Sequence, residues 1–309
     1  MSLPESTRTA LDDAQLDWSA DAPLHKRVYW RIGGSADALV NVRTLEELQA
    51  VQRIAHDTGT PLMVLGKGSN LLIADAGIRG IVVQLTGELA DTQPHGEHPV
   101  LLTAGAGLPL VVLLSRAKRF GWTGLACFAG IPGTIGGAVR MNAGSTMGET
   151  VTPLRSVDIV HRDGSLQTLT VDALDMSYRT SHLPAGSVLA RATFQTTTDD
   201  PEEEATRIKD FLARRKATQP LNLPSCGSTF RNPPGDAAGR LIEAAGLKGF
   251  RIGGAQVSEK HANFVVNLGA CSAANVRAVI EHVQDEVEQR FGVRLEREVH
   301  FVGDWGDAA

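Results

Sequence analysis

Cysteine and long apolar runs are scarce in this chain of 309 residues. The three cysteines, Cys127, Cys226 and Cys271, are too few and too scattered for a disulfide framework. No C-x-x-C pair occurs, so a structural zinc site is not expected, and no other metal site is predicted. The longest apolar run, Leu108–Leu114, is far shorter than the roughly 20 residues that a membrane span needs.

An excess of one charge is also lacking. Lys and Arg total 30 against 35 Asp and Glu, and the densest basic cluster is Arg214, Arg215 and Lys216. Three charges could hold a phosphate group or simply form a solvated helix end, but they do not make the basic face of a nucleic-acid binder. The first 15 residues are polar and do not resemble a secretory signal. We therefore expect a cytoplasmic protein that binds neither nucleic acid nor membrane.

The composition, 42% hydrophobic and 21% charged, is that of a globular protein long enough for two or three domains. Residues 1–27 are expected to be a poorly ordered lead-in. Subdomains are predicted at 28–90 and 91–200, and a C-terminal domain is predicted at 205–298, followed by a strand and tail at 299–309. Strands and helices do not alternate strictly, so the predicted fold class is α+β rather than a doubly wound sheet.

Helical spacing of apolar residues predicts a helix from Thr44 to about Thr58, with Thr44 and Glu47 forming a capping box. The clearest helical pattern ends at Phe291, and Gly292 is expected to terminate that helix. A further helix is expected to bury five apolar side chains: Leu108, Val111, Val112, Leu114 and Ala117. Strands are predicted at 38–42, 61–65, 81–85, 100–104, 154–161, 166–172, 188–196 and 298–302, with a hairpin at Asp163-Gly164.

Two glycine-rich segments are unusual enough to require a packing or binding reason. Four glycines stand between Gly130 and Gly137, and Gly66–Leu72 follows directly after a predicted strand. Glycines allow the backbone to approach a ligand closely, and successive N–H groups can bind a pyrophosphate. Tight turns with close strand packing would explain each segment equally well. Neither segment has the Rossmann or P-loop spacing, which disfavours the usual NAD-binding and ATP-binding folds.

Taken in order, these segments and several others resemble the UDP-N-acetylenolpyruvoylglucosamine reductase family over about residues 28–303. The motifs are Arg31-Ile32-Gly33-Gly34, Leu65-Gly66-x-Gly68-Ser69-Asn70-Leu71-Leu72, Gly130-Ile131-Pro132-Gly133-Thr134-x-Gly136-Gly137-Ala138-Val139-x-Met141-Asn142-Ala143-Gly144, Tyr178-Arg179-x-Ser181, Gly227-Ser228-x-Phe230-x-Asn232-Pro233, Gly253-Gly254-Ala255-Gln256-Val257-Ser258 and Leu295-Glu296-x-Glu298-Val299. The resemblance implies an FAD-binding fold of the vanillyl-alcohol oxidase type, with two α+β subdomains and a C-terminal α+β substrate-binding domain. The chain is similar to the shorter form of the family, which lacks a tyrosine-bearing loop.

The same resemblance implies that FAD is the cofactor and that NADPH is the co-substrate. NADPH and the UDP-sugar would take turns at one cleft. The implied cofactor-binding residues are Arg31, Ile32, Gly33, Leu65, Gly66, Lys67, Gly68, Ser69, Asn70, Leu71, Ala129, Gly130, Ile131, Pro132, Gly133, Thr134, Gly136, Gly137 and Ala138.

The family reduces an enolpyruvyl group, which requires stabilisation of an enolate and a source of a proton. By resemblance, Arg179 would bind the substrate carboxylate, Ser228 would donate the proton and Glu298 would assist the enolate. The family usually has proline where Arg297 stands, so Glu296 competes with Glu298 for the last role. Substrate binding is implied for Tyr178, Lys216 and Asn232.

Other interpretations of these residues stay open from the sequence alone. Arg179 could be a surface residue on a turn, Ser228 a turn serine, and Glu298 an exposed strand residue. His261 is expected to be structural, and Cys226 lacks the histidine–acid pair of a cysteine nucleophile. The rival functions are an oxidase with the same FAD fold and a catalytically inert nucleotide-sugar-binding protein. We expect a monomer.

Overall fold

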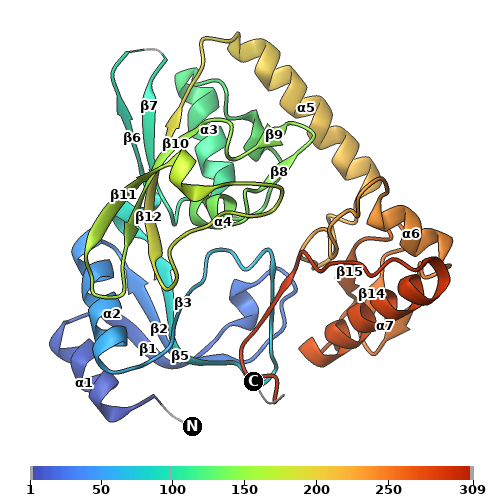
Figure 1. The fold of residues 1–309 in the computed structure, drawn as a ribbon, viewed down its shortest axis with the longest axis horizontal. Coiled ribbons are helices and arrows are strands. Elements are labelled where there is room, and N and C mark those ends of the chain that lie inside the picture. Colours follow the sequence, from blue (N-terminus) through green and yellow to red (C-terminus); the bar gives the residue numbers. More distant parts are fainter. Residues whose placement is uncertain (1–2, 98, 307–309) are drawn as a thin grey trace. The chain divides into compact units, whose positions relative to one another are not determined.

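The computed structural model of the chain describes residues 3–97 and 99–306, which divide into two compact units (Figure 1). Each unit has its own core of buried apolar side chains. Unit 1 comprises Met1–Ala20, Asp37–Lys67 and Gly80–Ala213, and unit 2 comprises Asp21–Ala36, Gly68–Arg79 and Arg214–Ala309. The architecture mixes helices with largely antiparallel sheets, and the predicted α+β class is confirmed. Within the described ranges, no helix is both long enough and apolar enough to span a membrane.

These units differ from the predicted domains. Residues 37–67 and 80–200, from both expected subdomains, share a core in unit 1, whereas residues 28–36 and 68–79 belong to unit 2. The division along the later chain falls inside helix α5 (Pro201–Thr218) instead of near residue 205. Residues 68–79 belong to unit 2 because β4 (Leu71–Ile73) pairs in parallel with β16 (His300–Val302). A pairing between segments more than 200 residues apart leaves no local signal in the sequence.

The first sheet of unit 1 is covered by α1 (Glu5–Asp13) and α2 (Leu45–Asp57) (Figure 1). Its strands are, in spatial order, β1 (Asp17–Pro23), β2 (Ser35–Val42), β5 (Ile78–Leu85) and β3 (Leu62–Val64). The prediction of a poorly ordered lead-in is wrong. Leu11 on α1 is fully buried, and the Thr7 hydroxyl lies 2.7 Å from the Thr60 hydroxyl, so α1 is fixed to the unit.

The predicted start of α2 is confirmed, although its cap differs in detail. The Thr44 hydroxyl accepts a hydrogen bond from the Glu47 N–H at 3.2 Å. The Glu47 carboxylate accepts from the N–H of Arg43 at 2.6 Å, one residue before the position that a capping box would use. The apolar face of the helix packs inward, with Leu48, Val51 and Ala55 buried.

The second sheet of unit 1 has five strands, and every neighbouring pair is antiparallel. Its order is β11 (Leu166–Thr170), β10 (Leu154–Val160), β12 (Val188–Gln195), β7 (Leu101–Gly105) and β6 (Thr92–His95). The predicted hairpin at Asp163-Gly164 is confirmed, with Gly164 at φ +81°. Helices α3 (Leu110–Phe120) and α4 (Ile135–Arg140) and the short strands β8 (Gly144–Ser145) and β9 (Gly148–Glu149) complete the unit.

One predicted helix face is only partly correct. Leu108 and Ala117 are buried as predicted, and Val112 and Leu114 pack partly buried against the core, but Val111 is 73% exposed. The helix begins at Leu110, and Leu110 and Leu113 are buried in addition. In a run of consecutive apolar residues, spacing alone does not show which side chain faces outward.

Unit 2 is built on α7 (Ala273–Phe291), which ends at Gly292 in the left-handed conformation, as predicted. Three antiparallel strands lie beside it, β13 (Arg251–Ile252), β14 (Ala255–Val257) and β15 (Val265–Asn267). Helix α6 (Ala238–Ala244) and the β4–β16 pair complete the unit. The predicted closing strand is confirmed as the shorter β16.

Asp75 joins the residue 68–79 segment to α7. Its carboxylate accepts hydrogen bonds from the N–H groups of Ala273 at 2.8 Å and Ala274 at 3.0 Å, in the first turn of the helix. Because these bonds satisfy two unpaired helix donors and complement the helix dipole, Asp75→Ala should lower the free energy of unfolding by about 1–2 kcal/mol. Urea unfolding measures the change. The control is Asp285→Ala, also on α7, which removes an exposed ion-pair partner of Arg294 and should change the free energy of unfolding by less than about 0.5 kcal/mol. An equal loss of stability in both variants would contradict a capping role for Asp75.

Candidate functional site

The first glycine segment leaves the carboxyl end of β3 in unit 1. Leu65 still continues the sheet, since its N–H donates to the Val83 carbonyl at 2.8 Å. The chain then turns away, and within the described residues the N–H groups of Gly66, Lys67 and Gly68 make no hydrogen bond to protein. A run of unpaired donors at the end of a strand is a ready anion-binding turn.

The second glycine segment is held by the turn that precedes α3. The Ile135 N–H donates to the Leu108 carbonyl at 3.0 Å, and the Gly136 N–H donates to the Ala106 carbonyl at 2.8 Å. These bonds fix the chain but leave the N–H groups of Gly133 and Thr134 without a protein acceptor among the described residues.

The two segments meet at Gly66 and Thr134. A Cβ atom on Gly66 would stand 2.7 Å from the Thr134 Oγ1, so a larger residue would displace that side chain. The backbone donors of Gly66 and Lys67 therefore lie in the same part of unit 1 as those of Gly133 and Thr134. This cradle of N–H groups, without a side chain over it at Gly66, fits the pyrophosphate of a dinucleotide cofactor.

Alanine at position 66 should weaken cofactor binding while the protein still folds. The added methyl group must displace Thr134, and it narrows the cradle where the two segments meet. We expect the Gly66→Ala apoprotein to bind FAD at least tenfold more weakly, as measured by quenching of flavin fluorescence on titration. Gly239→Ala is the matched control, because a Cβ there has no neighbour nearer than 3.6 Å. Equal affinities for the two variants would argue against a cofactor at Gly66.

A buried asparagine connects the second glycine segment to Arg179. Asn142 is fully buried, and its side chain donates to the Ser177 carbonyl at 2.9 Å and to the Glu149 carboxylate at 3.0 Å. Its Oδ1 accepts from the Val151 N–H at 3.1 Å. The amide is thus fully used, and it ties the turn that carries Arg179 to the end of α4.

Arg179 itself sits in a strained backbone conformation, with φ +58°. Its Nη2 donates to the Gly144 carbonyl at 3.1 Å, and its guanidinium lies 4.7 Å from the centroid of the Tyr178 ring. A left-handed backbone in a residue other than glycine costs free energy and is often found at binding sites. Tyr178 is 46% exposed and packs against the arginine.

In unit 2, the segments of Ser228 and Glu298 run side by side. The Glu298 N–H donates to the Thr229 carbonyl at 2.9 Å, and the Arg231 N–H donates to the Glu296 carbonyl at 2.9 Å. Phe230 and Arg297 form the antiparallel bridge between these bonds. Both Ser228 and Glu298 are partly exposed, so each remains accessible to a ligand.

Asn70, predicted as a cofactor ligand, also contacts this region. Its side-chain amide donates to the Glu298 carbonyl at 2.9 Å, and its own carbonyl accepts from the His300 N–H at 3.1 Å. The structure thus gives Asn70 a role in holding the segment of Glu298 that the sequence did not suggest.

The segment of Arg31, Ile32 and Gly33 also belongs to unit 2. Arg31 has φ +59°, and Ile32 is buried. A Cβ on Gly33 would stand 2.9 Å from the Ile73 Cβ, so close packing on β4 requires glycine there. Trp30 anchors the segment by donating from its indole nitrogen to the Val265 carbonyl at 2.9 Å.

Two further predicted substrate residues lie near helix ends, Asn232 in the loop before α6 and Lys216 in the last turn of α5. Asn232 accepts a hydrogen bond from the Ala238 N–H at 3.1 Å, at the start of α6. Lys216 is exposed near the end of α5, and its carbonyl accepts from the Lys260 ammonium at 2.7 Å. Cys226 is buried against the carbonyls of Gly68 and Leu71, and burial raises its pKa, which disfavours a thiolate nucleophile.

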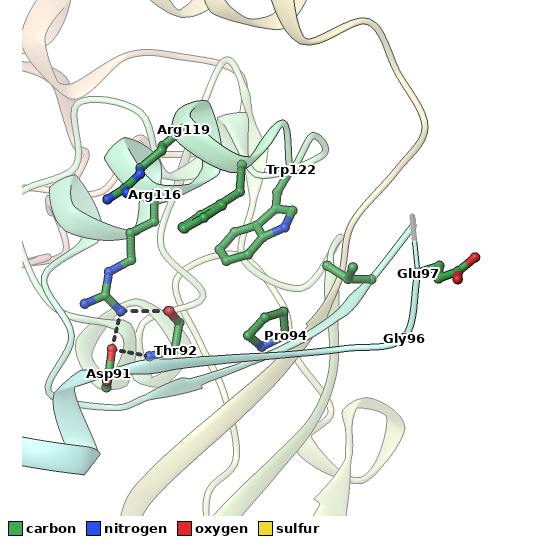
Figure 2. Close-up of a pocket in the computed structure, with 10 residues that line it drawn as sticks. Asp91, Thr92, Pro94, Gly96, Glu97, Arg116, Arg119 and Trp122 are labelled. Carbon is green, nitrogen blue, oxygen red and sulfur yellow. Dashed lines mark hydrogen bonds and ion pairs between the residues drawn. The ribbon is translucent and has the colours of Figure 1, made fainter.

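A cavity of about 530 Å³ lies elsewhere in unit 1, between the β6–β7 hairpin and the end of α3 (Figure 2). Arg116 crosses it and binds Asp91 and Thr92, and Trp122 stacks on Phe120 with the ring centroids 5.0 Å apart. None of the predicted site residues, all of which the structure describes, lines this cavity. We therefore assign the candidate site to the glycine cradle and not to this cavity.

Comparisons with known proteins show which family the chain resembles. A family described as "FAD binding domain" matches residues 36–170, and one described as "UDP-N-acetylenolpyruvoylglucosamine reductase, C-terminal domain" matches residues 219–302. The curated UDP-N-acetylenolpyruvoylglucosamine reductase of an Anaeromyxobacter species is 44% identical over 92% of this chain and 88% of its own length. That of Rubrobacter xylanophilus is 44% identical over 92% and 95%.

A solved structure gives the same result. The crystal structure of UDP-N-acetylenolpyruvylglucosamine reductase from Thermus caldophilus is 37% identical and superposes with a TM-score of 0.80, covering 93% of this chain and 98% of that one. Identity and coverage of this extent, together with both domain matches, leave one assignment. The chain belongs to the UDP-N-acetylenolpyruvoylglucosamine reductase family.

Proposed function

We propose that this protein reduces the enolpyruvyl group of UDP-N-acetylglucosamine enolpyruvate to UDP-N-acetylmuramate, using FAD as cofactor and NADPH as co-substrate. The reaction belongs to peptidoglycan precursor synthesis. The observation that carries the proposal is the cradle of unpaired N–H groups where Gly66 meets Thr134, in a chain 44% identical to reductases of this name. The cradle is the evidence for the cofactor, and membership of the family is the evidence for the substrate.

FAD bound at the cradle would supply hydride chemistry between NADPH and the substrate. The protein's part there is to hold the pyrophosphate on the backbone N–H groups of the two glycine segments. Neutral backbone donors suit this task because they are already oriented and cost no reorganisation when the anion arrives. By resemblance to the family, Arg31, Ile32 and Gly33 of unit 2 would also contribute to binding FAD.

Arg179 would bind the substrate carboxylate, on which negative charge develops during reduction. A guanidinium forms two parallel hydrogen bonds with a carboxylate and stays charged at any working pH. The bond to the Gly144 carbonyl occupies one donor of Arg179, and the Tyr178 ring supports its flat face. This arrangement presents the guanidinium in a fixed plane, which bidentate binding requires.

Ser228 would donate the proton to the carbon adjacent to the site of hydride addition, and Glu298 would assist the enolate. The pairing of their segments in unit 2 supports a shared role, because one set of main-chain bonds fixes both. A serine hydroxyl is a weak acid, so its charged surroundings must favour the transfer. Lys216, Asn232 and Tyr178 would contribute to binding the UDP-sugar. We further propose a cytoplasmic, monomeric enzyme.

Anaerobic stopped-flow spectroscopy tests the proposal in two steps. NADPH should bleach the flavin absorbance of the purified protein, and UDP-N-acetylglucosamine enolpyruvate added afterwards should restore it. Flavin that stays with the denatured protein, together with reoxidation by oxygen but not by the enolpyruvyl substrate, would favour an oxidase of the same fold. Protein that stays colourless after FAD is supplied would favour an inert binding protein.

A further inference from the structure

Asn263 is a buried polar residue to which neither the proposed mechanism nor the sequence analysis gives a role. Its side chain is 4% exposed and lies against the segment that follows Ser228. The Asn263 Oδ1 accepts a hydrogen bond from the Phe230 N–H at 2.9 Å, and its Nδ2 donates to the Phe230 carbonyl at 2.8 Å. The main-chain carbonyl of Asn263 accepts from the Thr229 N–H at 2.8 Å.

These three hydrogen bonds pair with Thr229 and Phe230 in the way that a neighbouring β-strand would. One amide side chain pairs with both main-chain groups of a single residue, as a neighbouring strand would. The partners also fix the orientation of the amide, because the Phe230 N–H needs an acceptor and the Phe230 carbonyl needs a donor. The other edge of the same segment pairs with residues 296–298, so Thr229 and Phe230 are held from two sides.

On the other side of Ser228, Cys226 is buried against the carbonyls of Gly68 and Leu71, but Gly227 stands between it and the serine. Gly227 has φ +76°, and no atom of the described residues beyond its chain neighbours lies within 4 Å of the position its Cβ would occupy. Among the described residues, the main-chain hydrogen bonds nearest to Ser228 are therefore those of Thr229 and Phe230, which Asn263 clamps. Asn263 is itself fixed, since its N–H donates to Nδ1 of His261 at 3.3 Å, and the His261 ring packs on Phe264 with the centroids 4.8 Å apart.

We propose that Asn263 is a positioning residue, which holds the Ser228 hydroxyl in place for proton transfer by clamping Thr229 and Phe230. The proposal rests on the proposed function, in which Ser228 is the proton donor. It assigns no contact between Asn263 and the substrate. Its specific consequence is that damage to the clamp affects the half-reaction that needs the proton and spares the one that does not.

Asn263→Asp is the sharpest test because it changes shape least. The carboxylate keeps an acceptor for the Phe230 N–H but places a second oxygen against the Phe230 carbonyl, where the amide donated. The segment should shift away from the repelling oxygen. A displacement of about 1 Å from a productive geometry can slow a reaction by about 10²-fold.

We expect Asn263→Asp to slow flavin reoxidation by UDP-N-acetylglucosamine enolpyruvate roughly 10–100-fold and to leave reduction by NADPH within about twofold. Rates are referred to bound flavin, so misfolded protein does not contribute. The matched control is Asn275→Ala, which weakens the α7 capping box in the same unit without touching the Ser228 segment. It should change neither half-reaction by more than about twofold, even where it lowers stability.

Two outcomes would overturn the inference: equal slowing of both half-reactions by Asn263→Asp, or no slowing of either. Where Asn263→Asp yields no flavin-loaded protein, Asn263→Ser, whose side chain cannot reach both Phe230 groups, is measured instead and judged by the same two outcomes. Ser228→Ala measured alongside separates the two proposals. If it leaves reoxidation fast, the proposed function of Ser228 fails; if it slows reoxidation and the Asn263 variant does not, only the positioning role fails.

A double-mutant cycle adds a readout that a merely structural residue would not move. With Ser228 already replaced by alanine, there is no hydroxyl left to position. Asn263→Asp should then slow reoxidation by less than about threefold further, because residues acting through one group are not additive. Full additivity would show that Asn263 acts independently of Ser228 and would contradict the proposal.

Discussion

Replacing Ser228 with alanine should slow reoxidation of the flavin by the enolpyruvyl substrate roughly 10²–10⁴-fold, while reduction by NADPH stays within about twofold. That loss corresponds to a barrier higher by roughly 3–5 kcal/mol. The asymmetry follows from the chemistry, since a carbon is protonated only in the second half-reaction. Single-turnover stopped-flow measurement of each half-reaction gives both rates on one preparation.

The control for this experiment is Ser225→Ala, three residues earlier on the same segment of unit 2. It makes the same chemical change at a partly exposed position that has no part in the proposed mechanism. Both of its half-reactions should stay within about twofold of the unchanged protein. Slowing of both half-reactions by Ser228→Ala, or of neither, would mean that Ser228 is not the proton donor.

Elements with a strong local signal could be predicted from the sequence. Helix α7 combines regular apolar spacing with a terminal glycine, and the β10–β11 hairpin turns at Asp163-Gly164. Both depend on neighbours in the chain, so the sequence contains the whole signal. The α+β class followed from the irregular order of such elements.

Elements defined by distant partners could not be predicted. Helix α1 looked like a polar terminus, and it is ordered because Leu11 reaches the core of unit 1 and Thr7 meets Thr60. The β4–β16 pair joins segments that are more than 200 residues apart, and it moves residues 68–79 into unit 2. Neither contact has a local sequence signal, because each joins segments that come together only in the complete fold.

The same distinction applies to the site. The glycine segments could be recognised because several motifs recur in a fixed order. The clamping roles of three asparagines near the site could not be predicted, since each amide has partners far away in sequence. Asn142 binds Ser177 35 residues on, Asn263 binds Phe230 33 residues back, and Asn70 binds Glu298 228 residues on. An asparagine in a loop usually signals a turn, and only burial reveals these as clamps.

Arg179→Lys should slow the second half-reaction roughly 10²-fold, with little effect on reduction by NADPH. Lysine keeps the charge but replaces the planar fork with a single ammonium group, so it cannot form two parallel bonds to a carboxylate. It would also lose the flat contact with Tyr178 and the bond to the Gly144 carbonyl that fixes the plane of the guanidinium. A tenfold loss corresponds to about 1.36 kcal/mol, so roughly 10²-fold matches the loss of one strong charge-assisted hydrogen bond.

Two further variants show which property of Arg179 matters. Arg155→Lys makes the same substitution in unit 1, at a side chain whose hydrogen bonds among the described residues go to the carbonyls of Thr152 and Leu154. Both of its half-reactions should stay unchanged. Tyr178→Phe keeps the ring beneath the guanidinium and removes only the hydroxyl, so it should reoxidise within about threefold of the unchanged protein. If Tyr178→Phe instead matched the loss in Arg179→Lys, the hydroxyl would have a chemical role of its own. An unchanged second half-reaction in Arg179→Lys would exclude bidentate binding of the carboxylate, because no lysine can reproduce the fork on which that binding depends.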